Sequence, residues 1–264
     1  MAGYLKELYA SGPETAIFDK PDGKKVNSLL LGTWLGVLEE RADGWLKVIT
    51  AGQDGWVHEK DTRDDFGLKV FFIDVGQGDS CLLECGNKRL LIDGGPGDNT
   101  LAYLKKFQYS YIPLKKGAKI HLDAVFITHF DEDHFKGIIS ILDDNDFTVG
   151  TIYHNGIARF ATKNRPKKYD SALGETDGAE GTRTLLKTSF SSLSDAKKLV
   201  KGGGLLETFR KFLNSALRAN HEKRLGSMRS LNSGDKYVPG FEGPDGLIME
   251  VLGPLCAPDG FKWF

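Results

Sequence analysis

The chain has few cysteines. Three of its 264 residues are cysteine, at Cys81, Cys85 and Cys256. An odd and sparse set of this kind does not build the disulfide framework of a small secreted domain. Cys81 and Cys85 also lack the C-x-x-C spacing of a zinc knuckle, so we expect them to be small packing residues. A reducing, cytoplasmic location is the default expectation.

Long apolar segments and a charge excess are missing as well. Residues 1–12 contain no apolar run and no cleavage pattern, so we expect no signal peptide. No stretch approaches the roughly 20 apolar residues that cross a bilayer, so we expect no membrane partner. The formal net charge is -1. Binding to a nucleic acid would therefore need a local basic patch.

Residues 1–62 predict a small all-β barrel, because turn residues recur at short intervals between apolar runs. The turns are Pro21-Asp22-Gly23, Gly32, Asp43-Gly44 and Asp54-Gly55. The paired Asp-Gly-Trp steps of this segment resemble the bacterial Src-homology-3 type barrel. Trp34, Trp45 and Trp56 fit either the core of such a barrel or a groove for a protein or peptide partner. We favour the core.

Residues 67–264 predict a second unit that contains both strands and helices. Residues 121–128 form a near-continuous apolar run, which is typical of a strand buried on both faces. Further strands are expected at 68–73, 81–83, 89–92 and 247–252, and helices from Asn99 or Thr100 to Phe107 and from Gly137 to Leu142. The polar stretch 157–240 is interpreted as an insertion or lid with one amphipathic helix between Leu205 and Leu217.

Four potential metal ligands lie directly after the buried strand, at His129, Asp131, Asp133 and His134. A turn at the carboxyl end of a strand can point alternate side chains at one locus. Histidine and aspartate together suit zinc, manganese or iron. The alternative is a solvated acidic turn in which Asp133 caps the next helix. Two histidines that bracket two carboxylates after an apolar strand favour the metal site.

Three motifs together resemble the metallo-β-lactamase superfamily. They are Phe72 to Ser80, Leu91 to Gly95, and His129-x-Asp131-x-Asp133-His134. The resemblance covers residues 67–154 well. It is closest to the hydrolase domain of the ComEC competence proteins, because Asp131 stands where the wider superfamily has histidine. The resemblance implies an α+β fold, a four-layer αββα sandwich with a dinuclear metal site at one edge.

The same resemblance implies a role for each ligand. His129 and Asp131 would bind the first metal ion. Asp133 and His134 would bind the second and serve as the catalytic residues. Asp93 would not bind a metal ion itself but would contact a ligand and orient it. Zinc is the expected metal and manganese the alternative, and a metal-bridging hydroxide would be the nucleophile of a hydrolysis.

Two features of the family loops stay open. Asp74 and Asp79 lie in a glycine-rich turn, where they could make local turn hydrogen bonds or support the site. Lys136 stands before Gly137, where the ComEC-like branch usually has two glycines. Lysine in place of glycine could limit how closely this turn approaches the neighbouring backbone.

The bridging carboxylate and the later histidine of the family have no match after residue 134. Gly234-Asp235 has the flanking residues of a surface turn. His154 follows an apolar stretch and is a possible extra ligand, with His221 as a weaker alternative. Because the chain stops at Phe264, we expect only the first half of the sandwich, a truncated domain of low activity.

The predicted function is metal-dependent hydrolysis, with DNA or another phosphodiester as the substrate. It rests on Asp131 and on a basic run at Arg159, Lys163, Arg165, Lys167 and Lys168, which could follow phosphates. Charge runs are more often solvated loops, and we favour that interpretation of the run itself. Two other functions remain open. One is a hydrolase of a small ester, lactam or thioester, and the other is a non-catalytic binding module.

Overall fold

A computed structural model describes residues 3–50, 53–110, 117–163, 167, 171–180, 183–242, 247–254 and 262–263. The chain divides into two compact units. One comprises Met1–Lys69 with Glu84–Asn87, and the other comprises Val70–Leu83 with Lys88–Phe264. Cys256, Arg165 and Lys168, which the sequence analysis singled out, lie outside the described residues.

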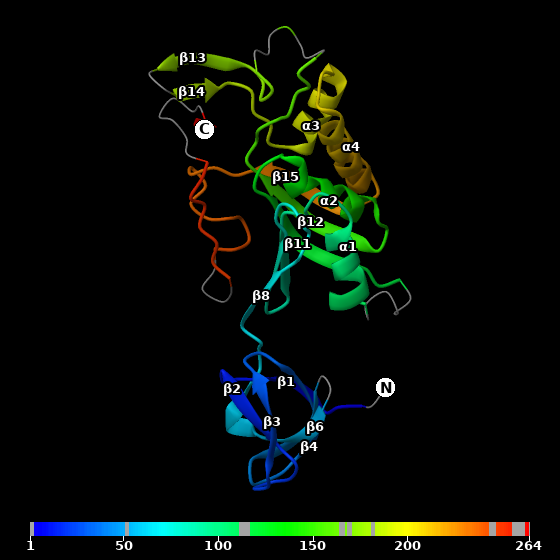
Figure 1. The fold of residues 1–264 in the computed structure, drawn as a ribbon, viewed down its shortest axis with the longest axis vertical. Helices are drawn as coiled ribbons and strands as arrows, with labels where there is room; N and C mark the ends of the chain where they lie inside the picture. The colour runs from blue at the N-terminus through cyan, green and yellow to red at the C-terminus, as the bar shows by residue number, and fades with distance from the viewer. Residues whose placement is uncertain are drawn as a thin grey trace. The chain divides into compact units, whose positions relative to one another are not determined.

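The first unit is built on a curled sheet with antiparallel pairings (Figure 1). Its strands are β1 (Lys6–Ala10), β2 (Glu14–Phe18), β3 (Lys25–Leu30), β4 (Trp34–Glu40), β5 (Trp45–Thr50), β6 (Gln53–His58) and β7 (Thr62–Arg63), with the 3-10 helix η1 (Glu59–Asp61) before β7. The strand order is β3-β2-β6-β5-β4-β1-β7. Alternating residues of these strands point inward and bury a core that includes Ile17, Leu35, Val48 and Val57.

Trp45 belongs to the interior of this unit, as the core interpretation predicts. It is 4% exposed, and its ring packs edge-on against Phe18 and at 4.2 Å from His58. Trp34 and Trp56 are half-buried. Trp34 meets the ring of Tyr4, and Trp56 lies under the guanidinium of Arg41. The three tryptophans therefore differ in burial, although they share a sequence pattern.

The second unit contains a sheet with the order β15-β12-β11-β10-β9-β8. Its strands are β8 (Leu68–Phe72), β9 (Cys81–Cys85), β10 (Lys88–Ile92), β11 (Ile120–Ile127), β12 (Phe147–His154) and β15 (Leu225–Ser230). The pairs β10–β11, β11–β12 and β12–β15 are parallel. The expected buried strand is confirmed as β11, which lies between two parallel neighbours.

Helices cover one face of this sheet (Figure 1). They are α1 (Asn99–Tyr103), continued by the π-helix η2 (Leu104–Gln108), and α2 (Glu132–Asp143), α3 (Leu193–Gly202) and α4 (Glu207–His221). Apolar residues at helical spacing, among them Phe135 and Ile138 of α2 and Phe209 and Phe212 of α4, pack on the strands in one cluster. A separate small sheet has the order β13-β14-β16, with β13 (Thr176–Glu180), β14 (Arg183–Leu186) and β16 (Lys262–Trp263).

The other face of the main sheet is covered by residues from two segments, 231–241 and 247–251. A strand was expected at 247–252, and this was wrong: only an isolated bridge from Tyr237 to Glu250 forms there. The apolar residues alternate as a strand requires, and Leu247, Met249 and Val251 do pack on the sheet. Their backbone, however, bonds to residues 236–241, as in the bond from the Val238 N–H to the Met249 carbonyl.

Two other expectations need correction. The second helix begins at Glu132 rather than at Gly137, so the ligand motif itself enters the helix. The stretch 157–240 was expected to be an insertion with one helix, but it contains both α3 and α4 and contributes β15 to the main sheet. Its polar composition concealed this, because β15 is an edge strand with exposed residues. Cys81 and Cys85 are free, half-buried thiols, and in the described part of the chain no helix is long and apolar enough to cross a membrane.

Candidate metal centre

The candidate site lies at the carboxyl ends of three neighbouring parallel strands. Asp93 follows β10, Thr128 and His129 follow β11, and Asn155 follows β12. Because parallel strands end at the same edge of a sheet, residues far apart in sequence meet there. The Asn155 side-chain amide donates to the Thr128 carbonyl at 3.1 Å, which joins two of these strand ends.

Two glycines allow the loops of the site to approach one another closely. A Cβ at Gly78, whose φ is +79°, would lie 1.8 Å from the Asp133 carbonyl oxygen. A Cβ at Gly137 would lie 2.0 Å from the Gly94 carbonyl oxygen. The Gly137 N–H donates to the Gly95 carbonyl at 2.8 Å. Gly137 therefore allows the close approach between α2 and the loop after β10, and Lys136 before it does not prevent it.

Asp93 is the most buried carboxylate of the site, at 1% exposure. Its Oδ1 accepts from the Thr128 N–H at 2.9 Å, and its Oδ2 accepts from the Thr128 hydroxyl at 2.6 Å. The same Oδ2 lies 2.9 Å from Nδ1 of His134. A buried carboxylate needs such partners, and here they also fix the orientation of the His134 ring.

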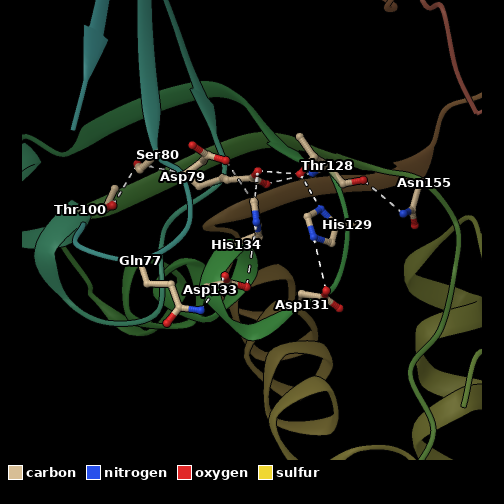
Figure 2. A network of polar contacts seen from close by, with 11 residues as sticks. Gln77, Asp79, Ser80, Thr100, Thr128, His129, Asp131, Asp133, His134 and Asn155 are labelled. Atoms are coloured by element: carbon tan, nitrogen blue, oxygen red, sulfur yellow. Dashed lines mark hydrogen bonds and ion pairs between the residues drawn. The ribbon is translucent and has the colours of Figure 1, made fainter. Parts of the chain in front are cut away.

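His129 and His134 lie beside one another, with ring centroids 4.0 Å apart (Figure 2). His129 Nε2 is 3.6 Å from Asp131 Oδ2, and His134 Nε2 is 4.0 Å from Asp133 Oδ1. The Nε2 atom of each imidazole, here called its outer nitrogen, thus lies next to one carboxylate of the motif. Asp131 precedes α2 at its N-cap without a side-chain capping bond, and Asp133 lies in the first turn. The alternative in which Asp133 is the N-cap does not describe this helix.

The two aspartates of the glycine-rich turn behave differently. Asp74 accepts from the Gly76 N–H at 3.0 Å, a local turn bond and one of the two roles that the sequence left open for it. Asp79 Oδ2 lies 3.9 Å from His134 Nδ1, but its side chain is 80% exposed. Between them, Gln77 donates to Asp133 Oδ2 at 3.2 Å. Gln77 and Asp79 are therefore the residues of this turn that lie close to the candidate ligands.

A cavity of about 550 Å³ opens beside His129 and Asp131. Its lining comes from the ends of β11 and β12, from the loop that follows β12, and from three residues farther along the chain: Thr128, His129, Phe130, Asp131, Asn155, Ile157, Arg159, Leu173, Gly253 and Pro254. One guanidinium nitrogen of Arg159 lies 3.0 Å from Asp131 Oδ1. Sequence reasoning placed Arg159 in a basic run and did not assign it to the site. Its only signal there was its charge.

Comparison with protein families matches residues 73–209, more than half of the chain, to the metallo-beta-lactamase superfamily. The chain belongs to this superfamily. Comparison with curated proteins and with solved structures gives no match. The family match spans the strand ends at Asp93 and His129 and the start of α2, where the polar network lies.

Members of the metallo-beta-lactamase superfamily usually bind divalent metal ions. In this chain the candidate donors form two pairs, each with one histidine and one aspartate. Imidazole nitrogen and carboxylate oxygen are the ligands that zinc and manganese take. Each pair stands within 4.0 Å, as His129 with Asp131 and His134 with Asp133. Among the residues that the structure describes, however, no group of three or more His, Cys, Asp or Glu residues is arranged to hold one ion. The assignment of the ligands stays a prediction.

The possible extra ligand His154 lies at the end of β12 and is 3% exposed. Its Nδ1 accepts from the Gly156 N–H at 2.9 Å, and its ring stacks on Phe190 at 4.3 Å. His221 ends α4, and His121 is an exposed residue of β11 that contacts Thr148. Asp235 bonds to Asn232 and Arg229 within a turn, as its flanking residues predict.

Proposed function

We propose that this chain is a metal-dependent hydrolase of phosphodiesters from the ComEC-like branch of the superfamily. The observation that carries the proposal is the pairing of His129 with Asp131 and of His134 with Asp133, with the two rings 4.0 Å apart. Two ions a few ångströms apart are the arrangement that suits hydrolysis of a phosphate ester. The domain would adopt the αββα sandwich of the family.

In this proposal the first ion is held by His129 and Asp131 and the second by Asp133 and His134. Zinc suits this donor set best, and manganese is the alternative. When bound, such ions supply a Lewis acid that activates water and stabilises negative charge on the reacting phosphate. To bind an ion, the possible extra ligand His154 would have to give up its contact with the Gly156 N–H.

The residues around the ligands would orient them and shape the substrate site. Asp93 accepts two bonds from Thr128 and holds the ring of His134, so it keeps the outer nitrogen of that ring directed at Asp133. Gln77 donates to Asp133 and would restrict its rotamers. The cavity beside His129 would receive the substrate. Asp133 and His134 are the residues to which we assign catalysis.

A phosphodiester is favoured over a neutral ester by the positive charge of Arg159 in the cavity wall. Arginine binds phosphate oxygens in a bidentate manner. Lys163 and Lys167 follow Arg159 in the sequence, are exposed, and could extend contact to a longer polyanion such as DNA. A hydrolase of a small ester, lactam or thioester would use the same ligands and is the second candidate.

The first unit is proposed to be a bacterial Src-homology-3 type barrel that recruits a protein or peptide partner. The turn-punctuated sequence and the small apolar core support this proposal. If the paired ligands bind no metal, the chain would instead be a non-catalytic binding module. The sparse cysteines are in keeping with a cytoplasmic protein.

The test is hydrolysis by the full chain loaded in turn with zinc and with manganese. Bis(4-nitrophenyl) phosphate is the phosphodiester, and 4-nitrophenyl acetate is a neutral ester with the same leaving group. We expect metal-dependent turnover of the diester that a chelator abolishes. Turnover of the acetate alone would support the second candidate, and no bound metal at all would support the binding module.

A further inference from the structure

The cavity beside His129 contains the cationic side chain of Arg159, which is not one of the proposed metal ligands. The guanidinium of Arg159 lies 3.0 Å from Asp131 Oδ1, and both line the cavity. The side chain of Arg159 is 32% exposed and that of Asp131 is 47% exposed, so solutes can reach both residues, although the Oδ1 of Asp131 that faces Arg159 is buried. The backbone of Arg159 is fixed, because its carbonyl accepts from the Leu206 N–H at 2.9 Å.

We propose that this cavity is an anion-binding subsite in which Arg159 holds the phosphate of an organic phosphodiester. The inference rests on the proposed function, because it names the substrate group that the site takes. Arg159 is a binding and specificity-determining residue in this proposal. It selects a substrate with a negative charge next to the reacting bond over a neutral ester.

Size and wall chemistry support an organic anion rather than a bare ion. The cavity measures about 550 Å³, within the roughly 300–1,000 Å³ typical of small-molecule sites. Ile157, Leu173 and Pro254 give it an apolar side. Thr128, His129 and Asn155 come from the strand ends and give it a polar side. A phosphate at Arg159 would place its organic substituent along the apolar wall.

The contact with Asp131 explains how the subsite would depend on the neighbouring ligands. The contact is an ion pair and not a hydrogen bond, since Asp131 Oδ1 accepts none among the described residues. The negative carboxylate attracts the guanidinium and repels an anion, so it competes with phosphate for Arg159. Neutralising the charge of Asp131 would release Arg159 for the substrate. The subsite would therefore bind anions weakly while Asp131 is charged and better once that charge is removed or compensated.

The first experiment measures binding of inorganic phosphate to the chelated, metal-free full chain by calorimetry, so it needs no turnover. D131N removes the competing charge, and we expect it to bind phosphate about two- to fivefold more tightly than the wild type, the range of an exposed ion pair. D131N/R159M should lose that gain. R210M removes an arginine that is ion-paired with Glu207 on α4, outside the cavity, and serves as the matched control. Equal affinity in D131N and D131N/R159M would overturn the subsite, whereas binding of phosphate by R210M should equal that of the wild type.

The second experiment compares R159M, R159K and R210M in the metal-loaded hydrolysis of the phosphodiester and the acetate. We expect R159M to raise KM for the diester about 10- to 100-fold, as expected for a lost charge-assisted hydrogen bond, and to leave KM for the acetate unchanged. R159K should recover part of the loss. An equal effect of R159M on both substrates would overturn the proposal, because a structural defect would not distinguish them.

Failure of the subsite and failure of the proposed function give different results. If the wild type hydrolyses no phosphodiester while phosphate binding follows Arg159, the hydrolase proposal fails and the anion site stands. If the diester is hydrolysed while R159M changes neither KM nor phosphate binding, the anion site is overturned and the hydrolase proposal stands.

Discussion

Nδ1 of His134 lies 2.9 Å from Oδ2 of Asp93, a carboxylate in a residue that is 1% exposed. A carboxylate can only accept at this contact, so Nδ1 must carry the proton. The outer nitrogen, Nε2, is then left with its lone pair in the neutral ring. This is the tautomer that a histidine needs to bind a metal ion through Nε2.

The first prediction concerns Asp93→Asn. The backbone of Asp93 has a φ of +55°, which asparagine tolerates. The amide would place a donor where His134 needs an acceptor and would favour the wrong tautomer. We expect zinc affinity, measured by calorimetry, to fall about 10- to 100-fold, with the fold retained by circular dichroism.

Asp79→Asn is the matched control for this substitution. Asp79 Oδ2 lies 3.9 Å from the same nitrogen of His134, but its side chain is 80% exposed. Its charge is screened by solvent, so we expect a change in zinc affinity of less than about threefold. A larger loss with Asp79→Asn than with Asp93→Asn would overturn the orienting role of Asp93 and assign it to the glycine-rich turn.

The second prediction concerns the ligands themselves. His129→Ala and His134→Ala should each remove one ligand of a different proposed ion and lower metal content, measured by atomic emission after dialysis. Hydrolysis should fall at least about 100-fold in each. His121→Ala, which removes an exposed histidine of β11, should retain wild-type metal content. Wild-type metal content in His129→Ala or His134→Ala would count against the assignment.

Much of the site could be predicted because its chemistry is local in sequence. His129, Asp131, Asp133 and His134 lie within six residues, so one strand end and one helix start bring them together. The apolar run of β11 is continuous and could be recognised as a buried strand. What could not be predicted was that α2 begins at Glu132, because its first turn is acidic and lacks the apolar spacing of its later turns.

Arg159 could not be assigned to the site because its position depends on long-range structure. It lies 28 residues beyond Asp131, past α2 and β12, and only the parallel pairing of β11 with β12 returns the chain to the same edge. The strand β15 escaped prediction for a related reason. Its exposed Gly226, Ser227 and Arg229 give the composition of a loop, and pairing with β12 alone makes it a strand.

The third prediction concerns Gly137→Ala in α2. Alanine at an exposed helix position usually stabilises by about 1 kcal/mol relative to glycine. Here the added Cβ would lie 2.0 Å from the Gly94 carbonyl oxygen, which belongs to the loop after Asp93. The loop or the helix must shift, so we expect the free energy of unfolding to fall by about 2–4 kcal/mol in urea denaturation.

Gly202→Ala in α3 is the control for this effect, because no heavy atom lies within 4 Å of the Cβ it would add. It should leave the free energy of unfolding unchanged or raise it slightly. A Gly137→Ala protein as stable as the wild type, with unchanged zinc affinity, would show that the contact between α2 and the loop after β10 is not close in solution.

The last prediction separates two roles for His154. Its ring is 3% exposed, stacks on Phe190 at 4.3 Å and accepts from the Gly156 N–H at 2.9 Å. Replacing it by alanine removes an aromatic contact and leaves a cavity, so we expect the free energy of unfolding to fall by about 2–4 kcal/mol. Because Nδ1 of His154 already accepts from the Gly156 N–H, we do not count His154 as a ligand. The fraction of the variant that stays folded should therefore bind zinc as the wild type does. Phe is the better replacement for the zinc titration, since it keeps the stacking on Phe190 and lacks both ring nitrogens. If the His154→Phe protein is folded but loses one bound metal ion, His154 is a ligand. Its ring would then have to turn away from Gly156 to bind the ion.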